Sequence, residues 1–238
     1  MLTGANALAA LSEAKVLVFG LGGVGSWAAE ALVRSGVEHI TLVDFDTVDI
    51  TNINRQIEAA TSTIGQSKAA ALAARLGDIN PDCVITPVQK FFSCKDEGIE
   101  KTAANFGIPK ADYIIDAIDS LESKLDLIEA AARFNVKLFS SMGMALKLDP
   151  TRLKTVVIWK TSGCALARNV REGLRKRGFN GNFTVVYSDE KIAQQKNDDY
   201  TSGKKINGSA VTVTAVAGMI LASLVVNDIC KQTNAIQP

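Results

Sequence analysis

The sequence is poor in the patterns that mark several common classes of protein. Its four cysteines are spread along the chain, and none stands in a Cys-x-x-Cys pair; they are Cys83, Cys94, Cys164 and Cys230. A disulfide framework is not expected in a chain of 238 residues of which 47% are hydrophobic. Structural zinc needs convergent ligands, and this spacing offers no local pair. We therefore expect free thiols in a reducing compartment.

A signal peptide, a membrane helix and a large excess of charge are also missing. The first 11 residues lack the basic region that opens a signal peptide. The most apolar stretch, 210–226, contains Thr212, Thr214 and Ser223 and falls short of the ~20 apolar residues that a membrane helix needs. The net charge is +1, which excludes a wholly basic nucleic-acid binder. We expect a cytoplasmic protein with no membrane partner, in which 210–226 is a buried helix.

Short apolar runs alternate with amphipathic stretches through the first 141 residues. The runs predict strands at 15–20, 39–44, 84–88, 113–117 and 137–141. The amphipathic stretches predict helices at 2–12, 25–35, 68–79, 96–105 and 121–134. This alternation predicts an α/β fold of the Rossmann-like kind, an open and mostly parallel sheet with helices on both faces.

The regular alternation of predicted strands and helices changes after residue 142. Strands are expected at 155–160 and 183–187, a helix at 170–177, and a polar loop at 194–205. We therefore expect two parts. Residues 1–145 form the nucleotide-binding domain, and residues 146–238 form a smaller mixed α/β extension packed on it.

A glycine-rich turn joins the first predicted strand to its helix. Gly20, Gly22, Gly23 and Gly25 fit the pattern G-x-G-x-x-G. Glycines in this place let the backbone turn sharply and approach a phosphate, which the N–H groups at the start of the helix then hold. Asp44, at the end of the second strand, suits a ribose hydroxyl. The turn predicts nucleotide binding but does not distinguish a dinucleotide from ATP.

Two cations favour a polyphosphate. Arg55 follows the second strand, and Lys68 opens the next helix. Arg55 can form a fork to phosphate oxygens, and Lys68 can supply a point charge. A nicotinamide-dependent dehydrogenase needs neither, and the single histidine, His39, begins a buried strand where a structural role is expected.

An acidic residue follows the fourth strand. Asp119 lies where ligands bind in an open α/β sheet, and its carboxylate could hold Mg²⁺ against phosphate oxygens. It also suits the N-cap of the helix at 121–134.

Four motifs in this order resemble the E1-like adenylating enzymes. They are GLGGVGSWAAEAL, LVDFDTVDITNINRQ, GQSK and DAID. The resemblance implies adenylation of a carboxylate by ATP with Mg²⁺, in which Arg55, Lys68 and Asp119 are catalytic and Asp119 is the magnesium ligand. The residues that it places around the nucleotide are Gly20, Gly22, Gly23, Gly25, Asp44, Asp46, Asn52, Arg55, Gln56, Lys68 and Asp119. It also implies a homodimer. Members usually begin with an arginine-bearing segment that reaches the nucleotide of the other subunit. This sequence begins about where that segment would end, so either the start is truncated or another cation takes over.

Almost the whole chain resembles a tRNA-modifying branch of this family. The resemblance rests on GVGSWAAEALVRSG, TNINRQ, DAIDSLESK, LDPTRL, VYSDE and INGSAVTVTAVAG. It implies ATP-dependent adenylation of the free carboxylate of threonylcarbamoyladenosine next to the anticodon. The carbamoyl nitrogen then closes a ring and AMP leaves. Such a reaction needs no enzyme nucleophile, because both reacting groups belong to one molecule.

The charge distribution suits a tRNA substrate. Residues 160–205 contain ten basic and five acidic side chains. Arg168, Arg171 and Arg175 are three and four residues apart and are expected to share a helix face that contacts the tRNA backbone, although a solvated helix would have the same pattern.

Two alternatives stay open. The first is adenylation of the C-terminus of a ubiquitin-like sulfur carrier, which the missing Cys-x-x-Cys pairs disfavour. The second is a nucleotide-binding scaffold for a sulfur-relay protein. Cys164, on a predicted loop, is expected to be structural or incidental.

Overall fold

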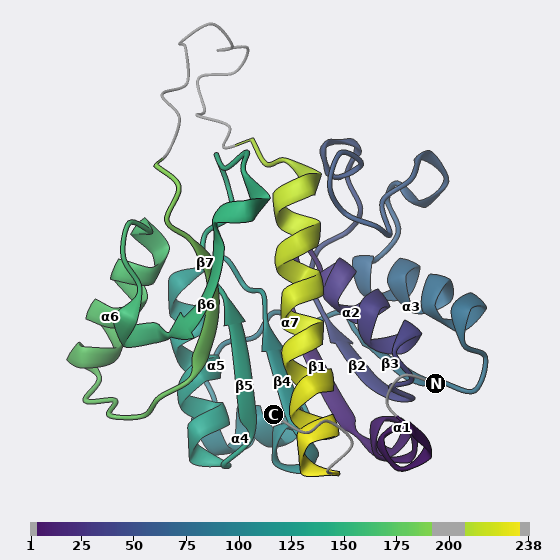
Figure 1. Cartoon of the computed structure of the whole chain (residues 1–238), viewed down its shortest axis with the longest axis horizontal. Helices are drawn as coiled ribbons and strands as arrows, with labels where there is room; N and C mark the ends of the chain where they lie inside the picture. Colours follow the sequence, from purple (N-terminus) through teal and green to yellow (C-terminus); the bar gives the residue numbers. More distant parts are fainter. Residues whose placement is uncertain (1–3, 192–207, 234–238) are drawn as a thin grey trace, which may run out of the picture.

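The computed structural model describes residues 4–191 and 208–233 as one sheet between two layers of helices (Figure 1). The strands are β1 Lys15–Phe19, β2 His39–Val43, β3 Val84–Val88, β4 Tyr113–Asp116, β5 Lys137–Ser141, β6 Leu153–Val157 and β7 Thr184–Ser188. The α-helices are α1 Gly4–Glu13, α2 Gly25–Arg34, α3 Lys68–Ile79, α4 Gly98–Asn105, α5 Leu121–Arg133, α6 Ala165–Lys176 and α7 Val211–Gln232.

The sheet has seven strands in the order β3-β2-β1-β4-β5-β7-β6. Every neighbouring pair is parallel except β6 and β7. After β1 the chain builds outward through β2 and β3, and it then returns to place β4 on the other side of β1. The predicted α/β, Rossmann-like fold is confirmed, with its switch point between β1 and β4.

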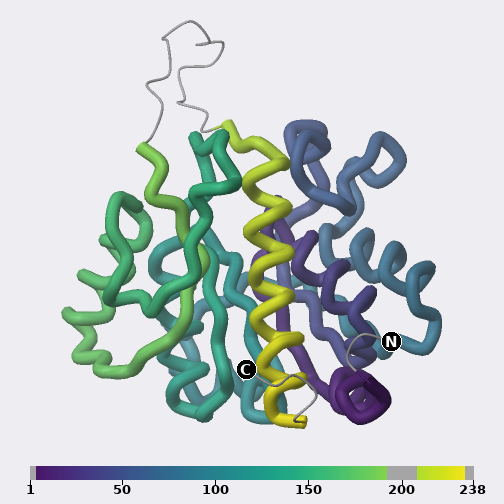
Figure 2. Tube along the Cα trace, viewed as in Figure 1, coloured from purple at the N-terminus to yellow at the C-terminus, as the bar shows by residue number. Residues whose placement is uncertain are grey.

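Alternate residues of each strand face opposite helical layers. Val16 and Val18 of β1 pack with α1, α2, α3 and α7, whereas Leu17 and Phe19 pack with α4, α5 and α6. Figures 1 and 2 show the first layer in front, where α7 crosses the sheet beside α2. Both faces are therefore buried, as a parallel sheet requires. This explains why the strands read as continuous apolar runs.

The two helices α2 and α7 approach closely because glycine lies between them. A Cβ atom on Gly218 would stand 2.4 Å from the carbonyl oxygen of Val24 and 3.0 Å from the amide nitrogen of Ala28. By length and composition α7 could cross a membrane, but half of its most apolar window is buried inside the structure. The expectation of a buried helix is confirmed for this half.

Several helix and strand boundaries differ from those expected from the sequence. α7 continues to Gln232, past Asn227 and Asp228, which interrupted the apolar pattern. α6 begins at Ala165 rather than at residue 170. The strand expected at 155–160 spans Leu153–Val157 and is followed by a 3-10 turn.

Gly36, which follows the C-cap residue Ser35, ends α2 with φ of +100°. Two other expectations concern the chain after residue 145. The loop expected at 194–205 lies outside the described residues. The division at residue 145 stays a prediction, while the structure shows β7 and β6 continuing the sheet beyond β5.

Candidate active site

The glycine turn lies at the switch point of the sheet. β1 ends at Phe19, and the chain turns at Gly20, which has φ of +83°. The amide of Gly20 donates a hydrogen bond to the carbonyl of Val43 at 2.9 Å, which ties the turn to the end of β2. The carboxyl ends of the strands on either side of a switch point are where open α/β sheets bind ligands.

Two glycines of the turn have no room for a side chain. A Cβ atom on Gly20 would lie 2.7 Å from the carbonyl oxygen of Ala117, just after β4. On Gly25 it would lie 1.8 Å from the carbonyl oxygen of Gly20. On Gly23 it would lie 3.0 Å from Oγ1 of Thr214 in α7, a tight contact with a side chain. Gly20 and Gly25 are therefore needed by the fold whether or not a nucleotide binds.

Gly22 is different, because packing does not demand it. A Cβ atom there would have one neighbour within 4 Å, Nε2 of Gln56 at 3.9 Å. The missing side chain leaves the backbone open to close approach by a phosphate. Helix α2 begins just after it, and its N-cap residue, Val24, offers no side-chain cap. The amide of Ser26 already donates to the carbonyl of Gly22 at 3.1 Å, but the positive end of the α2 dipole is open to an anion.

Asp44 holds the glycine turn through its carboxylate. Its carboxylate accepts hydrogen bonds from the amide of Leu21 at 2.7 Å and from the amide of Asp46 at 2.9 Å. Burial raises the pKa of Asp44, and these two bonds oppose the rise. A carboxylate has about four acceptor positions, so two remain for ribose hydroxyls.

Lys68, the first residue of α3, is buried, and its ammonium lies 2.9 Å from the carboxylate of Asp46. The amide of Lys68 also donates to the carbonyl of Asp46 at 3.1 Å. Because the Asp46 side chain is about half exposed, water can replace the ammonium as its partner at small cost. Lys68 can therefore turn from Asp46 to a phosphate.

Arg55 lies over the glycine turn, with its Cγ atom 3.1 Å from where a Cβ on Gly23 would stand. Its guanidinium donates to the carbonyl of Thr51 at 2.8 Å and to the side chain of Asn54 at 2.9 Å. The indole of Trp27 in α2 donates to the backbone carbonyl of Arg55 at 2.9 Å. The arginine is thus fixed by backbone contacts and keeps donors for an anion.

Asn52 and Gln56 are both buried in the same loop. The side chain of Asn52 accepts from the amide of Asp49 at 3.0 Å, in a capping box that shapes the 3-10 turn Ile50–Asn52. This contact gives Asn52 a role in shaping the loop. A direct role for either residue at the nucleotide stays a prediction.

A fully buried ion pair supports the loop that carries Asp119. The ammonium of Lys124 in α5 lies 2.7 Å from the carboxylate of Asp116, and both side chains are 0% exposed. The other carboxylate oxygen of Asp116 accepts from the amide of Ile118 at 3.1 Å. The pair therefore fixes the backbone just before Asp119.

Asp119 itself is exposed. The N-cap residue of α5 is Ser120, so the capping interpretation of Asp119 is wrong. Within residues 4–191 and 208–233, no group of three or more His, Cys, Asp or Glu could hold a metal. A magnesium ion on Asp119 would thus need phosphate oxygens and water, which suits its chemistry.

The comparisons with known proteins agree with this geometry. The family model described as the ThiF family matches residues 1–237. The chain belongs to the ThiF family. The tRNA threonylcarbamoyladenosine dehydratase of Bacillus subtilis (strain 168) is 40% identical over 238 residues, a match that covers 96% of this chain and 91% of that protein. The dehydratase of Escherichia coli (strain K12) is 34% identical, with 93% and 88% covered.

Other ThiF-family relatives match less of the chain. The molybdopterin-synthase adenylyltransferase of Salmonella typhimurium is 34% identical over 59% of this chain and 53% of that protein.

Among solved structures, Escherichia coli TcdA in complex with ATP has a TM-score of 0.85 at 33% identity, with 97% of this chain and 91% of that chain covered. The resemblance to adenylating enzymes is therefore confirmed.

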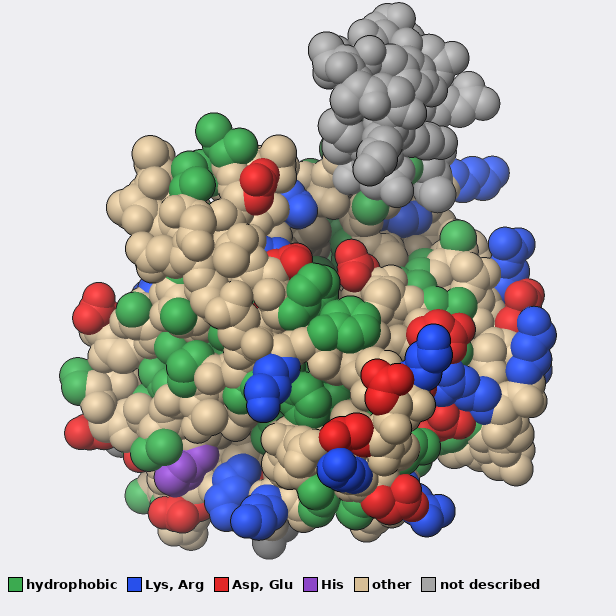
Figure 3. Space-filling view, turned by 180° about the vertical axis from the view of Figure 1, so that it is seen from behind, with side chains coloured by type: hydrophobic (Ala, Val, Ile, Leu, Met, Phe, Trp, Pro, Cys, Tyr) green, Lys and Arg blue, Asp and Glu red, His purple; other side chains and the backbone are tan. Residues whose placement is uncertain are grey.

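The three arginines expected to contact tRNA differ in their surroundings. Arg168 is exposed, and no ion pair to it is found among the described residues. Arg171 is half-buried and donates to the hydroxyl of Thr161. The guanidinium of Arg175 lies 5.4 Å from the ring centre of Trp159. Basic and acidic side chains are interspersed on the flank that carries α6, as Figure 3 shows from behind. Contact with tRNA stays a prediction for all three.

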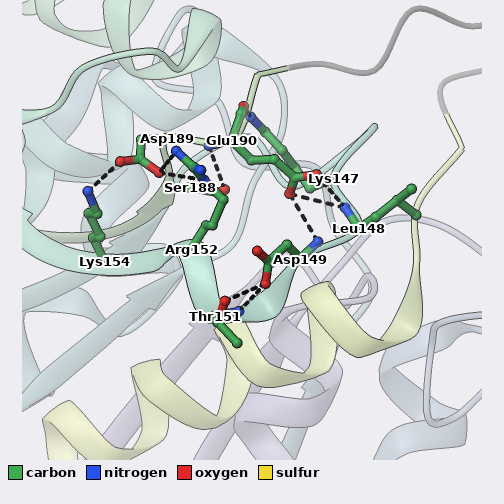
Figure 4. A network of polar contacts seen from close by, with 9 residues as sticks. All are labelled: Lys147, Leu148, Asp149, Thr151, Arg152, Lys154, Ser188, Asp189 and Glu190. Carbon is green, nitrogen blue, oxygen red and sulfur yellow. Dashed lines mark hydrogen bonds and ion pairs between the residues drawn. The ribbon is translucent and has the colours of Figure 1, made fainter.

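Two C-terminal motifs of this family member meet where β6 and β7 pair. The carboxylate of Glu190 accepts from the amides of Leu148 and Asp149 at 3.1 Å (Figure 4). Asp189 forms ion pairs with Lys154 and with Arg152, the latter at 2.9 Å. The segments LDPTRL and VYSDE therefore form one polar network next to β7.

The remaining sequence predictions concern cysteines and missed residues. All four thiols are free, as expected, and Cys164, outside any helix or strand as predicted, is buried at the N-cap of α6. Sequence reasoning missed Lys124, although it stands at an apolar position of the α5 pattern, between Leu121 and Leu125. It also missed Glu58, for which the polar segment 46–66 gave no periodic signal.

Proposed function

We propose that this protein is an ATP-dependent tRNA threonylcarbamoyladenosine dehydratase. The observation that carries the proposal is the glycine turn at the switch point, with Lys68 and Arg55 beside an uncapped helix N-terminus. The match of this chain to dehydratases over more than nine-tenths of its length supports the choice of substrate. The activity is expected in the cytoplasm, where tRNA is modified.

The reaction has two steps. A carboxylate oxygen of the threonylcarbamoyl group attacks the α-phosphorus of ATP, and pyrophosphate leaves. The carbamoyl nitrogen then attacks the activated carbonyl carbon and loses its proton, and AMP leaves with the former carboxylate oxygen. The nucleoside thus loses one water in total. Both reacting groups are held in one molecule, so the protein must mainly supply orientation and charge.

Each site residue has a role in this proposal. The amides of the glycine turn bind the phosphates, and Asp44 binds the ribose. Lys68 and Arg55 neutralise charge on the phosphates, with Lys68 released from Asp46. Asp119 holds Mg²⁺, which would neutralise phosphate charge when bound.

The decisive experiment measures AMP release from ATP and Mg²⁺, with and without tRNA that carries threonylcarbamoyladenosine. Digested tRNA is then examined by mass spectrometry. We expect tRNA-dependent AMP and a nucleoside that has lost one water. Asp119→Ala should abolish both. Asp82→Ala removes an exposed carboxylate in the loop before β3 and should leave both unchanged. Normal ATP turnover by Asp119→Ala would show that Asp119 is not the magnesium ligand.

A second candidate is adenylation of the C-terminus of a sulfur carrier. The match to molybdopterin-synthase adenylyltransferase favours it, but that match covers 59% of the chain. Carrier-driven exchange of pyrophosphate into ATP, with no dependence on tRNA, would move the assignment there. A sulfur-relay protein as a partner stays a prediction.

A homodimer is part of the same proposal. The outward side of α7 carries Thr212, Val216, Met219 and Ser223, which are exposed and uncharged. A second copy could cover this surface. Val216→Glu would then lower the sedimentation coefficient to that of a monomer, and an unchanged coefficient would exclude α7 from the interface.

A further inference from the structure

Orphaned polar atoms gather in the segment between Arg55 and Lys68. Among the residues that the structure describes, the buried side-chain atoms without a hydrogen-bond partner are Gln56 Oε1, Glu58 Oε1, Glu58 Oε2 and Ser67 Oγ. Leaving such an atom unpaired destabilises the folded protein, and more so when the group is charged. Native proteins keep few of them, and those kept call for an explanation. Both flanking cations belong to the proposed nucleotide site.

Glu58 is the most unusual of these residues. It is 3% exposed, yet neither carboxylate oxygen has a partner among the described residues. It lies near the hydroxyl of Ser26 in α2, the ammonium of Lys68 in α3 and the carboxylate of Asp44 after β2. The ammonium of Lys68 already lies 2.9 Å from the carboxylate of Asp46, so it is not a direct partner for the carboxylate of Glu58.

Ser26 connects Glu58 to the glycine turn. The Ser26 hydroxyl donates its one proton to the carbonyl of Gly22 at 2.7 Å. The same oxygen can still accept a proton, and the amide of Ile57 lies 3.4 Å from it. A protonated Glu58 can therefore donate to Ser26 while Ser26 keeps its bond to Gly22. An ionised Glu58 can only accept, and it would compete with Gly22 for the hydroxyl proton.

Burial is the largest influence on the protonation of Glu58. It raises the pKa of Glu58 to about 7, against the lowering effects of its own backbone amide and Lys68, and the charge of Asp44 adds to the rise. A nucleoside triphosphate on the glycine turn would bring several negative charges close to this carboxyl. Like charge disfavours ionisation, so binding would raise the pKa further. Linkage then requires that protonation of Glu58 strengthens binding.

We propose that Glu58 is a positioning residue whose carboxyl takes up a proton from solvent when a nucleoside triphosphate binds. The neutral carboxyl donates to Ser26 and so holds the carbonyl of Gly22 in the turn, while an ionised Glu58 repels the phosphates. The proposal rests on the proposed function, since it assumes that the turn binds ATP.

The test is calorimetric titration of the whole chain with ATP and saturating Mg²⁺, between pH 6 and 8.5. Buffers of different ionisation enthalpy report how many protons are taken up. In the wild type we expect uptake approaching one proton above pH 7. Affinity should fall as the pH rises, by up to about tenfold for each unit by which the nucleotide raises the pKa of Glu58.

Glu58→Gln mimics the neutral carboxyl. It should bind ATP with an affinity that varies little with pH, and without the proton uptake of the wild type. Glu122→Gln removes a carboxylate that is 78% exposed and bound to Arg177, and it should behave as the wild type does. Equal proton uptake by the wild type and Glu58→Gln, or ATP binding to the wild type without proton uptake, would overturn the role proposed for Glu58 and leave the proposed function intact. If the wild type binds no nucleotide at any pH, the proposed function fails as well.

A second variant covers the case in which Glu58→Gln does not fold. Ser26→Ala removes the acceptor that the proposal gives to the proton of the neutral Glu58 carboxyl. The pH at which affinity begins to fall should therefore move downward. A fall that begins at the same pH in Ser26→Ala and in the wild type would contradict the role given to this pair.

Discussion

The buried ion pair between Lys124 and Asp116 makes a sharp prediction about stability. The ammonium of Lys124 has three acceptors: the carboxylate of Asp116 at 2.7 Å, the hydroxyl of Ser140 at 3.3 Å and the carbonyl of Ser141 at 3.1 Å. Asp116 also accepts from the hydroxyl of Ser140 at 2.6 Å and from the amide of Ile118 at 3.1 Å. Every polar atom of the pair is thus satisfied within the protein.

Lys124→Met keeps most of the volume and removes the charge. The carboxylate of Asp116 would then be buried without its cation, which costs about 3–5 kcal/mol in such cases. Adding Asp116→Asn should recover part of the loss, because no buried charge remains.

The assay is urea unfolding followed by the fluorescence of Trp27 and Trp159, with the free energy taken from midpoints at unchanged slope. Lys101→Met is the matched control, because Lys101 forms an exposed pair with Glu97 at 2.9 Å. Exposed pairs contribute less than about 1 kcal/mol. If Lys124→Met lost no more stability than Lys101→Met, the buried pair would not hold the end of β4, and the support assigned to Asp119 would be withdrawn.

Three further predictions follow from single residues. Burial raises the pKa of Glu58 from 4.5 to about 7 in the folded protein. The wild type should therefore lose about 3 kcal/mol of unfolding free energy relative to Glu58→Gln as the pH rises from 4.5 to 7, and denaturation at several pH values would measure this loss. Gly218→Ala should cost about 1–3 kcal/mol, because its Cβ would strike the carbonyl of Val24, whereas Gly77→Ala in open space within α3 should gain about 0.5–1 kcal/mol. Arg168→Ala should reduce the salt dependence of tRNA binding by about one phosphate contact without changing stability, as filter binding at several salt concentrations would show.

Much of the fold follows from periodicity in the sequence. The strands before residue 142, apart from the exposed edge strand β3, are largely buried on both faces, so they appear as apolar runs, and their helices show one apolar side. The positions of the later elements depend on contacts between distant segments. α7 packs against α2 through Gly218, and a lone glycine in an apolar stretch does not reveal its partner. The end of α7 was missed because Asp228 reads as polar, while its carboxylate binds Lys137 and Tyr113.

The residues of the candidate site also divide into those that the sequence predicts and those that it does not. The glycine turn and Asp44 follow predicted strand ends, and Lys68 opens the next helix, so topology brings them to the same edge of the sheet. Glu58 could not be found this way, since its burial comes from a loop without periodic pattern that folds over α2 and α3. Lys124 was within reach, because an apolar position in an amphipathic helix is buried whatever residue fills it, and a buried ammonium requires an anion.

Three contacts join the start of α7 and the segment before it to the glycine turn, to the loop of Arg55 and to the loop after β5. Thr214 of α7 lies against Gly23. The side chain of Asn54, next to Arg55, donates to the carbonyl of Ser209 at 3.2 Å. Leu146, which has φ of +60°, donates through its amide to the carbonyl of Gly208 at 2.9 Å. The start of α7 is thus bound both to the glycine turn and to the loop after β5. A displacement of this helix would move the groups proposed to hold the phosphates, so ATP binding and the placement of the C-terminal region should be energetically coupled.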